Sequence, residues 1–243
     1  MDKTEQLTRA HRLGELIDGF PERVPGALPA LQEMLDNAAD DEVLAAAIDA
    51  TGLASGHQGA LALLIGRGLD GHASNQVRSA FARALATVPP DGELAEPATA
   101  ALCRLSADSE DEIRDWSCYA LGQLGVDGPA VREALVARIA DESPAARSEA
   151  LVALARLGDV RVVPVLRRRF ETDDPFDIEF LELTAAAAIA DPALLAGLLR
   201  IDAAWQDEGP VAAGDPADDD PADDESELFD ELEAAIAACR AAA

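Results

Sequence analysis

The chain has 243 residues, of which 49% are hydrophobic and only 4% aromatic, and its formal net charge is −28. This apolar content suffices for a sizeable core and excludes a chain that is disordered throughout. The negative charge repels phosphate backbones, so we expect no nucleic-acid partner. No apolar run approaches the length of a membrane span, so we expect no membrane contact either.

Residue types that carry catalytic chemistry form no motif. Cys103, Cys118 and Cys239 show no C-x-x-C spacing, so neither a disulfide framework nor a zinc site is predicted. The histidines have no ligand-like spacing, and no nucleophile triad or phosphate loop occurs. We therefore predict no catalytic residue, no metal and no cofactor. Reduced thiols and an N-terminus without the apolar core of a signal peptide predict a cytoplasmic protein.

Residues 1–39 are predicted to form a pair of capping helices. Apolar residues recur at helical spacing in "LTRAHRLGELIDGF" (7–20), and "ALPALQEML" (27–35) supplies a second apolar face. A stack of repeats needs such a cap because its end units otherwise expose apolar surface.

Residues 40–203 contain a helical pattern that recurs along the chain. The copies begin at Val43, Val77, Ile113, Ala146 and Ile178. With this first residue as position 0, small or apolar residues follow at positions 4, 7, 8 and 11, except that Glu182 interrupts position 4 of the last copy. Second amphipathic segments lie between copies, as at 129–141, 162–170 and 192–200. Two helices per roughly 33 residues predict an all-α fold, an α-solenoid of about five to six repeats.

The C-terminal part is predicted to consist of an acidic linker (204–225) and a helix (226–243). The last 43 residues hold 14 acidic residues and one arginine, and the linker offers almost nothing to bury. Ser226 is a plausible N-cap of the helix. Its apolar face is made of Leu228, Phe229, Leu232, Ile236 and Cys239. Two interpretations stay open: a docked cap of the stack, or a tethered recognition helix for a groove.

Residues 113–125, "IRDWSCYALGQLG", and 146–158, "ARSEALVALARLG", share the pattern V/I/A-R-x-x-A-x-x-A-L-G-x-L-G. Followed by a second helix that starts with proline, this pattern resembles the phycobilisome-lyase type of HEAT-like repeat. The resemblance covers about residues 40–200. It implies that the arginine at position 1 is structural and pairs with acids of neighbouring loops. This arginine is present as Arg78, Arg114 and Arg147, whereas Leu44 and Glu179 depart from it.

The side of each first helix opposite the packing stripe carries the candidate binding residues. At about 100° per residue, positions 2, 3, 6 and 10 lie on that side, and the resemblance implies that it lines a concave groove. Exposed Trp, Tyr and Arg are frequent interface anchors. For Trp116, sideways packing against the adjacent repeat is an open alternative. The predicted partner-binding residues are Arg83, Asp115, Trp116, Tyr119, Gln123, Glu149, Val152 and Arg156.

These features predict a non-catalytic scaffold or adaptor that binds another protein through the groove. A narrower hypothesis is an inhibitor or immunity-type protein that masks a basic partner, since the net charge is −28. One alternative is an enzyme or ligand carrier of the bilin-lyase type, which rests on fold analogy alone. Another is a DNA glycosylase-like HEAT enzyme, which the acidic repeats disfavour. A salt-rich cytoplasm would explain the acidity without any partner.

Overall fold

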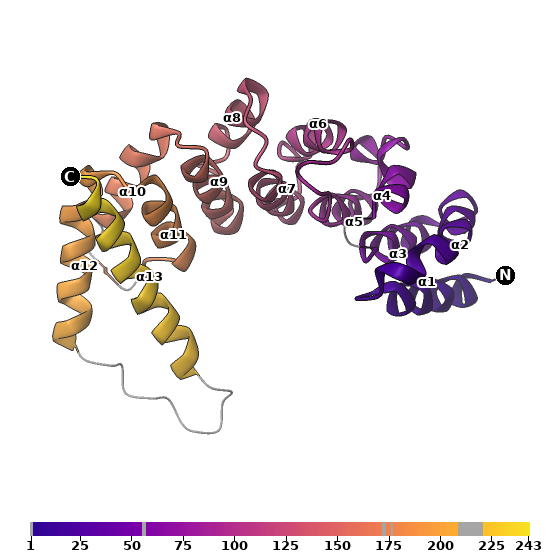
Figure 1. The fold of residues 1–243 in the computed structure, drawn as a ribbon, viewed down its shortest axis with the longest axis horizontal. Helices are drawn as coiled ribbons and strands as arrows, with labels where there is room; N and C mark the ends of the chain where they lie inside the picture. The colour runs from indigo at the N-terminus through magenta and orange to yellow at the C-terminus, as the bar shows by residue number, and fades with distance from the viewer. Residues whose placement is uncertain (1, 55–56, 172–173, 176, 209–220) are drawn as a thin grey trace. The chain divides into compact units, whose positions relative to one another are not determined.

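The computed structural model describes residues 2–54, 57–171, 174–175, 177–208 and 221–243, with side chains of the last helix described from residue 227. In this part of the chain the regular structure is entirely helical, which confirms the predicted all-α fold (Figure 1). The α-helices are α1 Lys3–Ile17, α2 Val24–Asp36, α3 Asp41–Gly52, α4 Gln58–Ile65, α5 Asn75–Leu85, α6 Ala95–Leu105, α7 Asp111–Leu124, α8 Pro129–Val136, α9 Pro144–Arg156, α10 Val163–Phe170, α11 Phe180–Ile189, α12 Leu195–Glu208 and α13 Pro221–Ala241. Short 3-10 turns are η1 Pro21–Arg23, η2 Leu69–Gly71, η3 Val160–Val162 and η4 Pro192–Leu194.

The chain divides into two compact units, Met1–Ala146 and Arg147–Ala243. In the first unit α1, α3, α5 and α7 pack side by side as one layer. Helices α2 and α4 pack together, as do α6 and α8, in a second layer on the other side of the unit (Figure 1). The predicted capping pair is present as α1 and α2, and α1 contacts α3 as a preceding repeat would.

The packing template is confirmed by burial. Positions 0, 4, 7 and 8 are buried in all five copies. Glu182 at position 4 is buried like its counterparts, so the register holds in the last copy. Two polar core residues satisfy their hydroxyls locally, because Thr51 and Ser117 donate to the carbonyls of Ala47 and Ile113.

Position 5 is also buried in every copy, which the template did not predict. A first helix inside a stack has a neighbouring first helix on each side, so it buries a wider arc than a single stripe. The residues at this position are Ile48, Ala82, Cys118, Leu151 and Leu183.

Arg78 links two loops of the first unit. Its Nε and Nη2 donate to the two carboxylate oxygens of Asp108 at 2.6 and 3.0 Å. Its Nη1 donates to the carbonyls of His72 and Ala73, in the loop that precedes its own helix. The structural role expected for this arginine is confirmed.

Arg114 repeats this arrangement one repeat later. Its Nε and Nη2 donate to Asp141 at 3.0 and 2.8 Å, while Nη1 donates to the carbonyls of Asp108 and Ser109. Asp141 also accepts from Arg138, and its side chain is only 4% exposed. Each arginine therefore joins the loop before its helix to an aspartate of the next loop.

In the second unit, the buried carboxylate of Glu182 is neutralised from the preceding helix. Arg169 of α10 donates through Nε and Nη2 to its two oxygens at 2.6 and 3.1 Å. The same carboxylate accepts from the backbone N–H of Glu179, the N-cap of α11. Arg169 further donates to the carbonyl of Asp177 at 2.6 Å. A charged residue at a core position is tolerated here because its oxygens have partners.

Helix α13 is docked within the second unit, against α11 and α12, as the capping interpretation of the C-terminal helix predicted. Leu232, Ile236 and Cys239 are buried. Phe229 stays 39% exposed while its ring meets that of Trp205 edge-on, with centroids 5.1 Å apart. The apolar face of the helix is thus covered by its own chain from Leu232 onward, whereas Phe229 is covered in part.

The bounds expected for the acidic linker need correction. Helix α12 continues to Glu208 and α13 already begins at Pro221, so both ends of the segment 204–225 are helical. Proline suits the first turn of a helix, and acidic residues there are favoured by the helix dipole, which explains the earlier start of α13. The expected N-cap Ser226 lies inside α13, where its side chain falls outside the described residues.

Replacing Phe229 by alanine is expected to lower the free energy of unfolding by about 1–2 kcal/mol, since an edge-on aromatic pair and some buried area are lost. Urea unfolding followed by tryptophan fluorescence measures this. Glu233→Ala, which alters an exposed residue of the same helix, is the control and should change the midpoint little. An unchanged midpoint for Phe229→Ala would mean that this end of α13 does not stabilise the packing of α13 against α11 and α12.

Candidate partner-binding face

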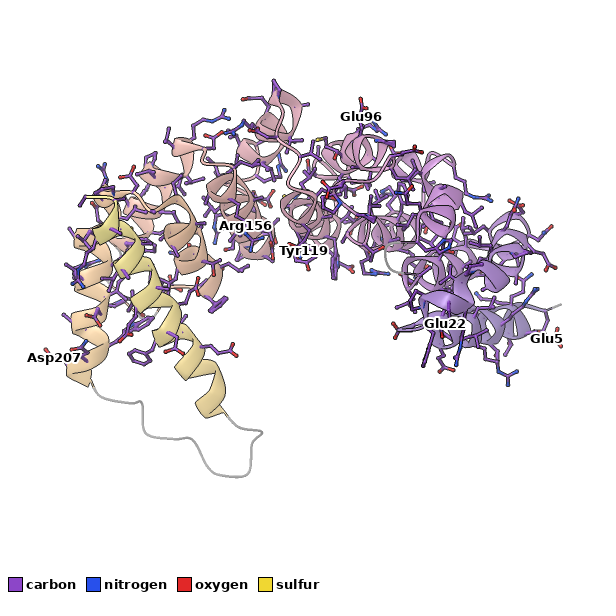
Figure 2. All side chains as sticks on the ribbon, in the orientation of Figure 1. Glu5, Glu22, Glu96, Tyr119, Arg156 and Asp207 are labelled. Atoms are coloured by element: carbon purple, nitrogen blue, oxygen red, sulfur yellow. The ribbon has the colours of Figure 1, made fainter. Side chains whose placement is uncertain are left out.

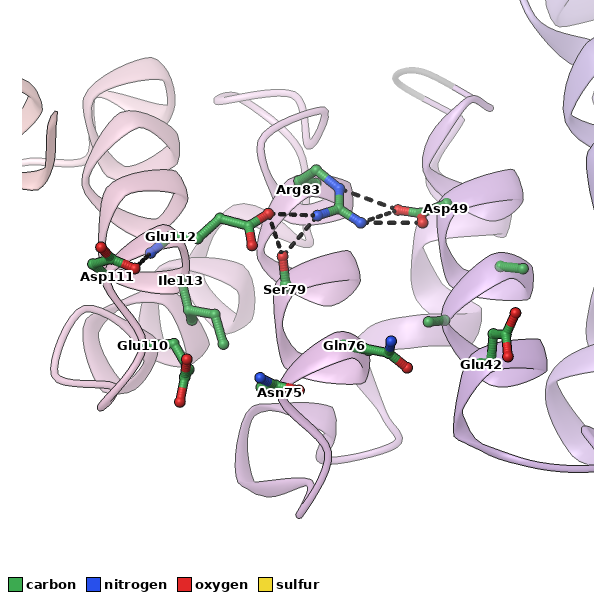
Figure 3. A pocket seen from close by; sticks show the side chains of 12 residues that line it. Glu42, Asp49, Asn75, Gln76, Ser79, Arg83, Glu110, Asp111, Glu112 and Ile113 are labelled. Carbon is green, nitrogen blue, oxygen red and sulfur yellow. Dashed lines mark hydrogen bonds and ion pairs between the residues drawn. The ribbon is translucent and has the colours of Figure 1, made fainter.

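The layer of α3, α5 and α7 presents one surface of mixed polar and apolar residues, which we call the α3–α5–α7 face. Ser79 and Ala80 are its two buried members. It consists of positions 2, 3, 6 and 10 of three copies: Ala45, Ala46, Asp49, Leu53, Ser79, Ala80, Arg83, Thr87, Asp115, Trp116, Tyr119 and Gln123. A pocket of about 370 Å³ opens on it (Figure 3). The pocket is lined by Glu42, Ala45, Ala46, Asp49, Asn75, Gln76, Ser79, Arg83, Glu110, Asp111, Glu112 and Ile113.

Arg83 crosses this pocket and ties three helices together. Its Nη2 donates to both carboxylate oxygens of Asp49 on α3, at 3.0 and 3.1 Å. Its Nη1 donates to Ser79 Oγ at 2.7 Å and to Glu112 of α7 at 3.2 Å (Figure 3). The guanidinium of Arg83 is therefore partly exposed, but its charge is already paired with Asp49 and Glu112.

The remaining charge of the pocket is negative. Five carboxylates and one guanidinium line it. Glu42 pairs with Lys3 at 2.6 Å outside the pocket. Glu110 and Asp111 are exposed, and neither takes part in a salt bridge with any residue that the structure describes. The carboxylate oxygens of Glu110 and Asp111 can accept hydrogen bonds from a cationic group that enters the pocket.

Trp116, Tyr119 and Gln123 follow on the same helix. The two aromatic rings meet edge-on, with centroids 5.7 Å apart and an interplanar angle of 87°. Both side chains are partly exposed, and Gln123 Nε2 donates to the Tyr119 hydroxyl at 2.9 Å. Tyr119 projects from the α7 side of the unit, away from Glu96 on α6 (Figure 2). The structure thus brings these predicted residues together.

Asp115 differs from its counterparts at position 2. There Ser79 and Ser148 are buried and each donates to an acidic side chain at the start of the next first helix, at 3.0 and 2.7 Å. Asp115 is partly buried and has no hydrogen-bond or ion-pair partner among the described residues. Burial raises its pKa, and the neighbouring Glu112 and Asp111 raise it further.

The three predicted residues of α9 belong to the second unit and are described separately. Glu149 is partly exposed and Arg156 is exposed. Val152 is only 3% exposed, so its prediction as a partner-binding residue is wrong. The physical reason is that residues 150–155 are all buried, which means that this stretch of α9 is covered on every side.

The acidic residues that line the pocket were not among the predicted partner-binding residues. Glu110 is the N-cap of α7, and Asp111 lies in its first turn. Glu110 to Glu112 precede position 0 of the template, so a search for repeated packing positions does not single them out. Their common signal is the local run "SEDE" (109–112), which holds three acidic residues, as many as "ADDE" (39–42) at the start of α3.

Other kinds of site find little support. Among the described side chains, no group of three or more His, Cys, Asp and Glu residues could hold a metal ion. His57 is the N-cap of α4, with Nδ1 accepting from the N–H of Ala60. None of the helices in the described ranges combines the length and apolar character needed to cross a bilayer.

The fold defines a class of protein: an all-α solenoid of stacked helix pairs. The chain belongs to the HEAT-repeat family, because a family model described as HEAT repeats matches residues 28–122 and 98–190. These two matches together span more than half of the chain. The family resemblance seen in the sequence is confirmed at this level.

Several solved structures share the fold. YibA of Escherichia coli is 20% identical with a TM-score of 0.62, over 87% of this chain and 70% of that chain. A computationally designed armadillo repeat protein for modular peptide recognition is 21% identical with a TM-score of 0.56, over 77% of this chain and 93% of that chain. At these identities the likeness concerns the fold alone. No curated protein matches the sequence significantly.

Proposed function

We propose that this protein is a non-catalytic scaffold that binds a basic segment of another protein along the α3–α5–α7 face. The observation that carries the proposal is the pocket, which Glu110 and Asp111 line together with an arginine whose charge is already neutralised by Asp49 and Glu112. Such a site repels anions and attracts ammonium or guanidinium groups.

The fold supports a protein or peptide as the ligand. HEAT repeats present a continuous row of first helices, which suits an extended segment. A solved structure of similar fold is a designed armadillo protein for modular peptide recognition. Cys103, Cys118 and Cys239 are not joined in disulfides, which fits a reducing compartment such as the cytoplasm.

An inhibitor or immunity-type role is a narrower form of the same proposal. It would require that the bound segment belongs to the working surface of a basic partner, which the chain then masks. The net charge of −28 supports this form because it would accelerate association with such a partner. The association rate should then fall steeply with ionic strength.

Neutralising the pocket tests the proposed function. The probe is a fluorescein-labelled peptide of alternating arginine and serine, followed by anisotropy at low salt with the full chain. We expect Glu110→Gln with Asp111→Asn to weaken binding about three- to tenfold, since each lost charge pair contributes a fraction of a kcal/mol to about 1 kcal/mol. Circular dichroism checks that loss of two acids from the first turn of α7 leaves the helix formed.

The matched control removes two acids from the other layer. Glu93 and Glu96 are exposed, and Glu96 lies on the far side of the unit from Tyr119 (Figure 2). Glu93→Gln with Glu96→Gln changes the net charge by the same amount and should leave binding within about twofold. If both double variants weakened peptide binding equally, the proposal would be contradicted, because binding would then depend on the net charge of the chain.

A further inference from the structure

Trp116 and Tyr119 form an open aromatic corner on α7. Their rings stand at 87° with centroids 5.7 Å apart, and both side chains are partly exposed. The hydrogen bond from Gln123 Nε2 to the Tyr119 hydroxyl, at 2.9 Å, holds the tyrosine in place. Arg23 lies over the ring of Phe20, and no cation of the described residues lies over either ring of this corner.

A carboxylate without a partner stands next to the corner. Asp115 lies one residue before Trp116 and four before Tyr119, so it shares a face of the helix with the tyrosine. The hydroxyls of the equivalent serines, Ser79 and Ser148, donate hydrogen bonds to acidic side chains of the same chain. Asp115 has no such contact among the described residues, which leaves its oxygens available to a donor from outside.

The surroundings favour a cation as that donor. Asp111 and Glu112 of the pocket wall lie one helical turn before Asp115 and Trp116. A cation over a tryptophan or tyrosine face is attracted by the ring quadrupole, and more strongly when partly desolvated. A guanidinium group is planar, stacks on aromatic faces and offers two parallel N–H groups to one carboxylate. An ammonium group also donates hydrogen bonds, but it is not planar and has no two parallel N–H groups.

We propose that Asp115, Trp116 and Tyr119 form a subsite for an arginine side chain of the bound segment. The guanidinium stacks in the aromatic corner while its N–H groups donate to Asp115. The neighbouring pocket holds a second basic group of the same segment. This inference rests on the proposed function, because it assigns the recognition of one residue within the segment.

Three peptides that differ at one residue test the subsite on the full chain. Each is a short serine–glycine peptide with one basic anchor for the pocket and, at the variable position, arginine, lysine or citrulline. Citrulline keeps the shape of arginine and lacks its charge. We expect the wild-type chain to prefer the arginine peptide about three- to thirtyfold over the citrulline peptide, and by a smaller factor over the lysine peptide.

Asp115→Asn and Trp116→Leu should each remove most of this preference, whereas Tyr119→Phe, which keeps the ring, should retain it. Asp115→Asn is suited to the test because the raised pKa of Asp115 means that its ionised form disfavours the folded chain. Protonated Asp115 therefore stabilises the folded chain relative to ionised Asp115. This stabilisation is present at low pH and is lost as the pH rises through the pKa of Asp115 in the folded chain. At neutral pH the asparagine chain should therefore melt at the same or a higher temperature.

The outcomes separate this inference from the proposed function. Equal binding of the three peptides by the wild-type chain overturns the subsite, and so does an arginine preference that survives both Asp115→Asn and Trp116→Leu. If binding of all three peptides still falls when Glu110 and Asp111 are neutralised, the proposed function stands without the subsite. If no peptide binds the wild-type chain, both fail.

Discussion

Replacing Arg169 by alanine is expected to lower the free energy of unfolding by about 3–5 kcal/mol, because the substitution leaves a buried carboxylate without its counter-charge. Glu182 has no exposed side-chain surface and receives two hydrogen bonds from Arg169. Without them it must either stay ionised in a core position or take up a proton. Urea unfolding monitored by circular dichroism measures the loss.

The matched control for this prediction is Arg167→Ala. Arg167 lies on the same helix, but its side chain is 60% exposed and its nearest carboxylate is that of Glu171 at 3.9 Å. Its removal should cost no more than about 0.5 kcal/mol. A second variant, Arg169→Ala with Glu182→Leu, should recover much of the loss, since an apolar residue needs no partner at position 4. Equal midpoints for Arg167→Ala and Arg169→Ala would contradict the assignment.

Replacing Arg114 by alanine is expected to cost about 2–3 kcal/mol, since the hydrogen bonds that it donates to Asp141 join two loops through a carboxylate that is 4% exposed. Arg104→Ala is the control, because Arg104 is 61% exposed and makes one contact with Asp70. Hydrogen exchange adds a local readout: the loop before α7 should lose protection in Arg114→Ala.

The same pair predicts a dependence on pH. The hydrogen bond from Arg114 is the largest cause that lowers the pKa of Asp141, and the backbone N–H of Ser143 lowers it further. A lowered folded-state pKa gives stability that is present above the unfolded pKa and is lost as pH falls through the folded one. Asp141→Asn should therefore be less stable at neutral pH and lose less stability on acidification than the wild-type chain. If the free energy of unfolding fell equally with pH in Asp141→Asn and in the wild-type chain, the ion pair of Asp141 with Arg114 would not contribute to stability.

Most of the fold could be predicted because one packing rule recurs along the chain. Positions 0, 4, 7 and 8 face the interior in every copy, and small residues such as Ala50 and Ala84 let neighbouring helices approach closely. Position 5 could not be predicted from one amphipathic stripe. Its burial in residues such as Ile48 and Cys118 depends on the neighbouring first helices, which a helical wheel does not represent.

The candidate site was predicted in part. Trp116 and Tyr119 could be identified because their positions point away from the packing stripe. The pocket beside them could not, since Glu110 and Asp111 precede the repeated positions and come to line one pocket with Arg83 only through the packing of three helices. Val152 was wrongly predicted to be exposed, because the helical periodicity was read as if one side of α9 faced solvent.

Carboxyl footprinting by mass spectrometry tests whether a basic segment binds at the α3–α5–α7 face. Carbodiimide labelling of the full chain, with and without the saturating arginine–serine peptide, measures the accessibility of individual acidic residues. We expect labelling of Glu110 and Asp111 to fall on binding while that of Glu93 and Glu96 stays unchanged. Protection confined to the acidic residues 201–243, or spread evenly over the chain, would contradict binding at the α3–α5–α7 face.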